Sequence, residues 1–435
     1  MRNDVNAALG KAASHTDSVA SHLASSMTMN SAASSNSGGF DYQPRPRVVF
    51  GPRSVARVGE LAGEFGARRV LLVTDPGLVA AGHAQRVEDA LQSAGLGVVT
   101  YAQVRENPDT RDVEQCVAVA RSAGVDLLVG LGGGSSMDTA KGCNFIYTNG
   151  GQMKDYWGVG KATRPMLPLI AIPTTAGTGS ECQSATLIAD EQTHQKMACL
   201  DPKAVARVAL LDPELTVSQP PRVTACTGID AIAHAVETAV TRPRNALSLM
   251  YSHEAFKLTV GALERVLTHP LDLEGRGRML LGAAFAGTAI ENSMLGAAHS
   301  AANPLTAHFN VLHGQAVGMM LPWVVRFNAA EPAARRAYAE LASAPEIACV
   351  SEGLDSAVDA LVQRLHELLD LAGFPLSLGE CGVTRSSIPT LAEEATRQWT
   401  AGFNPRTASV KDFVELYEAA WEGRPASAAK AICAT

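Results

Sequence analysis

The segment Asp126-Leu127-Leu128-Val129-Gly130-Leu131-Gly132-Gly133-Gly134-Ser135 joins a short apolar run directly to three consecutive glycines. An aliphatic run of this length, bounded by turn residues, predicts a buried strand, and we expect a helix to begin near Ser136. Consecutive glycines permit positive φ angles and close approach of a ligand to the backbone. The N–H groups and the positive dipole end of the following helix favour a phosphate. The segment therefore predicts a strand, a pyrophosphate-binding loop and a helix.

Apolar runs and amphipathic stretches alternate on both sides of this segment, beginning at residues 47–51. The other predicted strands are residues 69–74, 97–101, 168–173 and 207–211, with a β-hairpin over 185–201. Helices are predicted over 79–94 and 111–123. This alternation predicts a parallel sheet covered by helices on both faces.

The loop after residues 168–173 is rich in small hydroxyl side chains, beginning with Thr174 and Thr175. Open α/β sheets bind ligands at the carboxyl ends of their strands, so a ligand is expected here. The glycine run over 132–134 is not the G-x-G-x-x-G fingerprint, and it follows the third strand of the alternation instead of the first. The predicted phosphate site therefore differs from that of the standard Rossmann fold in both its sequence and its position along the chain.

Strand signals largely end at Pro220-Pro221, and long helical periodicities follow. The predicted helices of this half are residues 223–240, 245–267, 275–292, 355–372 and 410–422. We expect a disordered extension over 1–39, an α/β domain over 40–219 and an all-helical domain over 220–435.

A candidate metal site lies in the helical half. Asp230 and His234 are four residues apart on a predicted helix, so both side chains can reach one ion. His299 and His313 add two imidazoles in an apolar, uncharged region. Three histidines and one carboxylate favour Zn²⁺ or Fe²⁺ over Ca²⁺ or Mg²⁺, which prefer oxygen ligands. Because the ion and the phosphate loop come from different halves, we expect the active site in a cleft between them.

The composition argues against a nucleic-acid-binding, a disulfide-bonded or a membrane-spanning protein. A formal net charge of −7, with no basic stripe, argues against a nucleic-acid partner. The eight cysteines form no Cys-x-x-Cys pair, which favours reduced thiols in the cytoplasm. No apolar run is long enough to span a bilayer, and residues 1–39 lack the apolar core of a secretory signal peptide. We expect a cytoplasmic protein with no membrane partner.

Taken together, these motifs resemble the iron-containing alcohol dehydrogenase family, which is related in structure to glycerol dehydrogenase and dehydroquinate synthase. Asn404-Pro405-Arg406 is similar to the C-terminal signature of the family, and the resemblance extends from about residue 41 to 423. The other matching segments are Gly132-Gly133-Gly134-Ser135 with Asp138-Thr139-Ala140-Lys141, Pro173-Thr174-Thr175-Ala176-Gly177-Thr178, Thr227-Gly228-Ile229-Asp230 with His234, and His299 with His313-Gly314.

The resemblance implies a dinucleotide-binding α/β domain followed by an all-helical metal-binding domain. The implied metal ligands are Asp230, His234, His299 and His313, with Fe²⁺ typical of the family and Zn²⁺ as the alternative ion. The implied cofactor residues are Asp75 and Asn107 toward the adenosine half, Gly133, Gly134, Ser135 and Asp138 around the pyrophosphate, Thr174 and Thr175 at the middle of the cofactor, and Lys196 and Leu215 toward the nicotinamide. A carboxylate at Asp75 repels a 2′-phosphate, so NAD is favoured over NADP.

The implied activity is metal-dependent, NAD(H)-linked hydride transfer between a small alcohol and its carbonyl partner, in a homo-oligomeric enzyme. A hydroxyacid–oxoacid transhydrogenase and a maleylacetate reductase remain open. A dehydroquinate-synthase-like lyase is less favoured, because residues 286–320 contain no Lys or Arg for an anionic substrate. A catalytically silent metal-binding protein is disfavoured by the intact set of metal ligands.

One position departs from the family pattern. Several members carry a second histidine four residues after the third ligand, where this chain has Asn303. Asparagine cannot titrate near neutral pH, so a proton relay through this position is excluded here. His308 is the other candidate for a relay, and Asn303-Pro304 is also consistent with the end of a helix.

Overall fold

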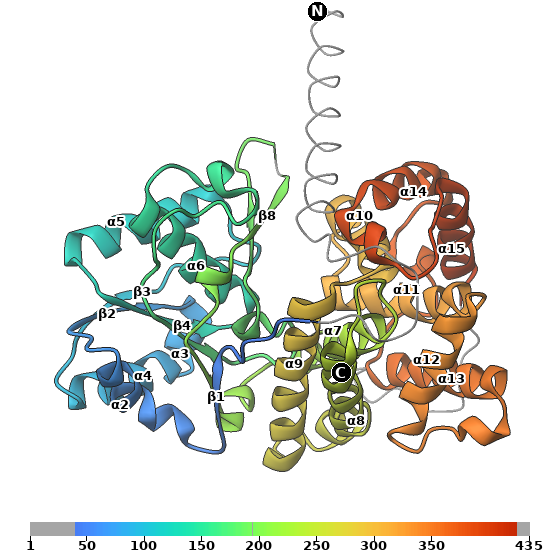
Figure 1. Ribbon diagram of the computed structural model, residues 1–435, viewed down its shortest axis with the longest axis horizontal. Helices are drawn as coiled ribbons and strands as arrows, with labels where there is room; N and C mark the ends of the chain where they lie inside the picture. Colours follow the sequence, from blue (N-terminus) through green and yellow to red (C-terminus); the bar gives the residue numbers. More distant parts are fainter. Residues whose placement is uncertain (1–39, 194, 424–435) are drawn as a thin grey trace, which may run out of the picture.

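The computed structural model describes residues 40–193 and 195–423. An α/β part, coloured blue to green in Figure 1, lies beside a helical part coloured yellow-green to red. The predicted extension over residues 1–39 lies outside the described residues. Within the described part of the chain, no helix combines the length and the apolar composition that crossing a bilayer requires.

The α/β part is built on a six-stranded parallel sheet with the order β1-β9-β6-β4-β2-β3. Its strands are β1 (Arg47–Phe50), β2 (Arg69–Val73), β3 (Gly97–Tyr101), β4 (Leu127–Gly132), β6 (Leu169–Pro173) and β9 (Val208–Leu211). β4 is buried along its whole length, which explains why its sequence is aliphatic without polar alternation. The predicted parallel sheet is confirmed.

Helices cover both faces of this sheet. They are α2 (Val58–Glu64), α3 (Pro76–Ala80), α4 (His83–Ser93), α5 (Thr110–Ala123) and α6 (Gly134–Asn149). Successive residues of a strand point to opposite faces. Leu71 and Val73 accordingly pack in a core with α5 and α6, whereas Val70 and Leu72 pack with α2 and α4.

The predicted hairpin forms a second, smaller sheet. β7 (Ala185–Ala189) pairs antiparallel with β8 (Lys196–Leu200), and β5 (Gly158–Val159) pairs with the outer side of β8. An isolated bridge between Asp109 and Ala189 ties this hairpin to the loop before α5. The hairpin thereby comes close to the segment that joins β3 to α5.

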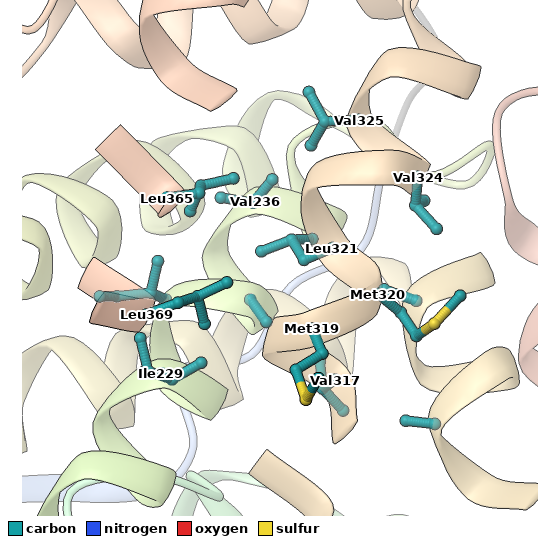
Figure 2. Packing of buried hydrophobic residues seen from close by; sticks show 14 of the residues in the cluster. Ile229, Val236, Val317, Met319, Met320, Leu321, Val324, Val325, Leu365 and Leu369 are labelled. Carbon is teal, nitrogen blue, oxygen red and sulfur yellow. The ribbon is translucent and has the colours of Figure 1, made fainter. Parts of the chain in front are cut away.

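Nine α-helices form the described helical part. They are α7 (Pro221–Thr238), α8 (Ala246–Thr268), α9 (Leu273–Ser293), α10 (Ala297–Phe309), α11 (His313–Asn328), α12 (Pro332–Ser343), α13 (Leu354–Leu371), α14 (Ile388–Arg397) and α15 (Val410–Glu422). Figure 2 shows their common core, where α11 packs between α7 and α13 through side chains such as Val317, Ile229 and Leu369. The fold class predicted from the sequence is confirmed.

Several predicted elements differ in detail. The helix predicted over 79–94 is two helices, because Gly82 has a φ of 79° and separates α3 from α4. Helices α10, α11, α12 and α14 were not predicted. α10 and α11 are buried on nearly all sides, so they lack the amphipathic pattern that marks a surface helix. Asn303-Pro304 does not end a helix, since α10 continues through Pro304 to Phe309.

The two parts meet in a small apolar cluster. Leu211 at the end of β9 and Cys182 after β6 pack against Leu280 and Ala284 of α9. β9 ends before the proposed domain boundary at 219/220 and α7 begins immediately after it. That boundary stays a proposal.

The tight packing at Gly318 of α11 provides a test of the helical core. An ideal Cβ atom at this position would overlap Ile229 and lie 2.9 Å from Cδ2 of Leu369. We expect Gly318→Ala to lower the free energy of unfolding by about 1–3 kcal/mol, because overpacking outweighs the better helix propensity of alanine. Denaturant unfolding followed by circular dichroism measures the change.

Gly261 of α8 is the matched control, because an added Cβ there meets no atom within 4 Å. Gly261→Ala should leave the stability unchanged or raise it by up to about 1 kcal/mol. Equal effects of the two substitutions would contradict the packing described for Gly318.

Candidate active site

Three of the predicted cofactor segments follow neighbouring strands of the sheet. Asp75 comes after β2, the glycine loop ends β4, and Thr174 and Thr175 follow β6. These strands are adjacent in the order β6-β4-β2, with Gly132 paired to Pro173. Because the strands are parallel, all three segments lie at one edge of the sheet. The chain leaves β2 and β4 in opposite directions across the sheet, the arrangement that opens a ligand crevice.

The glycine loop is shaped for a close backbone approach. Gly132 has a φ of 147°, and a side chain there would overlap Ser136. An ideal Cβ at Gly133 would lie 3.2 Å from Thr175, so the glycine loop and the hydroxyl-rich loop are in contact. No side chain caps the N-terminus of α6, which leaves its first N–H groups for a ligand.

Three predicted cofactor residues from distant segments are joined by hydrogen bonds. The backbone N–H of Asn107 donates to Oγ of Ser135 at 3.3 Å. The Nζ atom of Lys196, on β8, donates to Oδ1 of Asn107 at 3.4 Å. Through Asn107, the small sheet therefore links Lys196 to the glycine loop, and its predicted role toward the nicotinamide stays a prediction.

The remaining predicted cofactor residues are engaged in different ways. Oδ1 of Asp75 caps α3 by accepting from Leu78 N at 3.0 Å. Oδ1 of Asp138 accepts from Ser180 Oγ at 3.2 Å, and Thr174 N donates to the carbonyl of Gly132 at 3.0 Å. The side chain of Leu215 is fully buried in the core shared with α2 and α4. Its place among the cofactor residues stays a prediction, since this side chain lies beneath the surface of the site.

Three of the four predicted metal ligands, the histidines, converge on one carboxylate oxygen of the fourth, Asp230. The Nε2 atoms of His234 and His299 each lie 3.5 Å from Oδ1 of Asp230, and Nε2 of His313 lies 3.9 Å from it. Asp230 and His234 come from α7, His299 from α10 and His313 from the first position of α11. Three of the side chains are buried, whereas that of His313 is 41% exposed. The cluster is therefore reached from the His313 side.

The charges of the cluster depend on one another. Burial alone would raise the pKa of Asp230, but His234, His299 and His313 outweigh it and hold this pKa well below its usual range. Burial opposes charge on His299 as well, yet Glu237 and Asp230 raise its pKa to about 9. Burial lowers the pKa of His234. Asp230 thus remains an anion, and a buried anion is stabilised by a positive charge beside it. A protonated histidine or a bound cation can supply that charge.

The donor atoms fit a divalent transition metal ion. Tetrahedral ligands with bonds of about 2.1 Å lie roughly 3.4 Å apart. The distances from Oδ1 of Asp230 to Nε2 of His234 and of His299 are close to this value, at 3.5 Å each, and the distance to Nε2 of His313 is 3.9 Å. Oδ1 of Asp230 and Nε2 of His299 are buried and accept or donate no hydrogen bond within the described residues. Asp230, His299 and His313 offer atoms that all lie within 4.8 Å of one another. Imidazole nitrogens with one carboxylate suit Fe²⁺ or Zn²⁺.

Two glycines bring the hydroxyl-rich loop against α7, which carries two of the predicted metal ligands, and against α9. An ideal Cβ at Gly177 would lie 2.6 Å from Cβ of Thr227 on α7. Gly179 has a φ of 61°, and its backbone touches the backbone of Gly287 on α9. Side chains at these positions would separate the two parts. The loop that follows β6 is thereby held one helical turn from Asp230.

Sequence reasoning missed three residues that support the site. Glu237 lies on α7 and contacts His299. Asn404 accepts a hydrogen bond at the start of α10. Lys141, fully buried on α6, donates to the carbonyls of Ser180, Gln183 and Ala185 and so shapes the hydroxyl-rich loop. The signal for Glu237 was a carboxylate three residues after His234, on the same face of a helix that is otherwise mostly apolar.

Comparison with known proteins places both parts in one family. The family model described as "Iron-containing alcohol dehydrogenase" matches residues 44–213. The model described as "Fe-containing alcohol dehydrogenase family, C-terminal" matches residues 224–421.

Individual relatives agree with this match over nearly their whole length. Lactaldehyde reductase of Escherichia coli (strain K12) is 34% identical over 374 residues, which is 86% of this chain and 97% of that protein. NAD-dependent methanol dehydrogenase of Bacillus methanolicus is 32% identical over 371 residues, which is 85% of this chain and 97% of that protein. The crystal structure of sulfoacetaldehyde reductase from Bifidobacterium kashiwanohense in complex with NAD⁺ superposes with a TM-score of 0.78 at 28% identity. The superposition covers 87% of this chain and 98% of that one. The chain belongs to the iron-containing alcohol dehydrogenase family.

Proposed function

We propose that this protein is a metal-dependent, NAD(H)-linked alcohol dehydrogenase that also works as an aldehyde reductase. The observation that carries the proposal is the convergence of Asp230, His234, His299 and His313 beside the loop that follows β6. A metal site and a nucleotide-binding edge in contact are what hydride transfer to or from an alcohol requires.

The proposed metal ligands are Asp230, His234, His299 and His313, holding Fe²⁺ or Zn²⁺. When bound, the ion would serve as a Lewis acid toward the oxygen of the substrate. Asp230 supplies the anionic ligand, and three of the four side chains are shielded from water. The exposed side of His313 leaves room for a substrate to approach.

For the cofactor, we propose NAD along the carboxyl edge of the sheet. When bound, its nicotinamide carries the hydride. The N-terminus of α6, with Gly133, Gly134 and Ser135, would hold the pyrophosphate, supported by the uncapped helix end. Lys196 would extend from β8 toward the nicotinamide half, as the family resemblance implies, and its ammonium group contacts Asn107 of the cofactor set. Thr174 and Thr175 would line the path between these two regions.

The proposed substrate is a small alcohol or aldehyde. The relatives named for lactaldehyde and methanol support this class. Apolar side chains gather where the small sheet faces the helical part, including Leu187, Met294 and Trp399. The single charge in the apolar stretch 283–305 is Glu291, and its carboxylate accepts from Ser184 N at 2.8 Å. A neutral substrate fits these surroundings best.

Proton transfer in this protein would bypass position 303. Nδ2 of Asn303 donates to Gln398 Oε1 at 3.0 Å. His308 is paired with Glu394 at 2.8 Å, and it lies nine residues beyond His299 on α10, roughly 13 Å along the helix axis. We propose that protons exchange with water on the exposed side of His313.

We also propose a homo-oligomer located in the cytoplasm. β1 is the edge strand of the main sheet, with β9 as its strand partner in the described residues. Val48 is 41% and Phe50 46% exposed on the same face of β1. An exposed apolar edge strand can pair with a second copy of itself.

The proposed location in the cytoplasm is supported by the cysteines. Every cysteine in residues 40–423 is a free thiol, the state that a reducing compartment maintains.

The first prediction from the proposed function concerns the metal. His313→Ala should lose bound metal and NADH-dependent aldehyde reduction together, with turnover falling by about 100-fold or more, since even changes around a ligand weaken metal binding by 10–100-fold. Metal content by mass spectrometry and NADH oxidation with small aldehydes and 2-oxo acids measure both. Chelation of the wild-type protein should abolish turnover, and Fe²⁺ or Zn²⁺ should restore it.

His308→Ala is the control, because it removes an imidazole from the far end of α10. It should keep both metal and turnover. If His313→Ala retained full metal content and activity, the ligand assignment would be wrong. Turnover that requires a hydroxyacid and an oxoacid but no free NADH would instead indicate a transhydrogenase.

The second prediction concerns the choice of cofactor. Asp75→Ser removes the carboxylate but keeps an oxygen that can cap α3. We expect the ratio of kcat/KM for NADPH to that for NADH to rise by about tenfold or more, equivalent to roughly 1.4 kcal/mol, because the repulsion of a 2′-phosphate is lost. Steady-state kinetics with both cofactors measures it. An unchanged ratio would remove Asp75 from the adenine ribose site.

The third prediction concerns assembly. The wild-type protein should have at least twice the chain mass of 45.5 kDa in light scattering, and the double substitution Val48→Lys with Phe50→Lys should be monomeric. Leu271→Lys, at a 76% exposed position before α9, should leave the mass unchanged. A wild-type monomer, or an oligomer that survives the double substitution, would exclude pairing through β1.

A further inference from the structure

Two buried polar side chains outside the ligand set surround the segment that carries His299. Glu237 is 2% exposed and Asn404 is 1% exposed. We infer that Glu237 and Asn404 are positioning residues that fix the orientation of His299 and join α7 to α10, two of the three helices that carry the proposed metal ligands. The inference rests on the proposed role of His299 as a metal ligand.

Glu237 contacts the ring nitrogen of His299 that faces away from the cluster. Its Oε2 lies 2.5 Å from Nδ1 of His299, while Nε2 of the same ring lies 3.5 Å from Asp230 Oδ1. A carboxylate at Nδ1 holds the hydrogen on that nitrogen and leaves Nε2 as the metal-facing atom. Glu237 thereby selects both the tautomer and the rotation of the ring.

The second oxygen of Glu237 fixes the backbone as well. Oε1 accepts from the N–H of Ala298 at 2.7 Å. Glu237 lies three residues after His234 on α7, so both side chains project from the same face of the helix. One carboxylate thus holds the ring of His299 and the peptide directly before it.

Asn404 completes the N-terminal cap of α10. The N-cap position is Gly296, which has no side chain to satisfy the first N–H groups. Oδ1 of Asn404 accepts from Ala297 N at 3.1 Å. Asn404 is itself held by Asn328 of α11, through reciprocal amide bonds of 3.1 and 2.7 Å. The start of α10 is therefore anchored to α7 on one side and to α11 on the other.

Position 296 has no room for a side chain, because Asn404 and Glu237 both approach the start of α10 closely there. An ideal Cβ there would lie 2.8 Å from Asn404 Oδ1 and 3.1 Å from Glu237 Oε1. A side chain would displace both cap acceptors at once. The glycine is required for the close approach of two polar side chains to the helix end, while its own φ of −132° is open to any residue.

Binding of Co²⁺ to the metal-free, full-length protein tests the inference. The variants are Glu237→Gln and Asn404→Ala, with His299→Ala as the reference for loss of a ligand. Glutamine cannot accept at two positions with its single oxygen, so one of the two bonds of Glu237 is lost. We expect Co²⁺ affinity to fall by about 10–100-fold in Glu237→Gln, by the magnitude typical of groups that orient metal ligands. The visible spectrum of the Co²⁺-saturated protein should also shift.

Asp212→Asn is the matched control. Asp212 is a fully buried carboxylate of the α/β part that accepts from the backbone N–H groups of Arg53, Val55 and Glu214. It should leave Co²⁺ affinity and spectrum unchanged, which separates positioning of His299 from a general loss of stability. NADH binding, followed by fluorescence, checks that each variant is folded.

The outcomes are distinct. Wild-type affinity and spectrum in Glu237→Gln, with loss of Co²⁺ binding in His299→Ala, would overturn the inference. Wild-type Co²⁺ binding in His299→Ala would overturn the proposed ligand set instead. If Glu237→Gln does not fold, Asn404→Ala decides: weaker binding with an altered spectrum supports the inference, and unchanged binding overturns it.

Discussion

The backbone contact between Gly179 and Gly287 is the constraint on which the proposed active site depends. Gly179 belongs to the loop after β6, at the edge of the sheet where we propose that NAD binds, and Gly287 belongs to α9 of the helical part. Their backbones touch because neither residue has a side chain, and the φ of 61° at Gly179 also favours glycine. Hydride transfer requires reacting atoms within about 3–3.5 Å, so a small separation of the two parts would be costly.

The metal cluster depends on packing in a different way. α7 carries Asp230 and His234 on one face, while Ile229, Ile232 and Val236 on other faces lie in the core of the helical part. A helix that is buried all round cannot rotate to relieve a misplaced side chain. The directions of the polar side chains are therefore set by apolar contacts with α8, α11 and α13, and the cost of burying Asp230 is offset by the three histidines around it.

The features of the fold and of the candidate site that the sequence predicts correctly are those determined by short-range sequence patterns. The aliphatic run before Gly132 specifies a buried strand and its loop, and the spacing of Asp230 and His234 specifies a shared helix face. The approach of His299 and His313 to that face depends on how α10 and α11 cross α7, which no local pattern encodes. α10 was missed because its buried surface has no polar side, and Pro304 suggested an end that tertiary contacts override. Glu237 was missed as a partner of His299, and Asn404 as a partner of Ala297 at the start of α10, because these contacts span 62 and 107 residues.

The helical conformation and position of α10 depend more on contacts with neighbouring elements than on the helix propensity of its own sequence. It contains Pro304, a weak choice for the interior of an isolated helix, and its N-cap residue Gly296 has no side chain to accept from the first N–H groups. Other elements hold it instead: Tyr417 donates to the carbonyl of Ala301 at 2.7 Å, and Ser300 bonds to Thr400 at 2.7 Å. An ion bound by His299 would add one more such contact, between α10 and α7. Because a ligand that binds only the ordered state stabilises that state, metal binding and the order of α10 are thermodynamically linked.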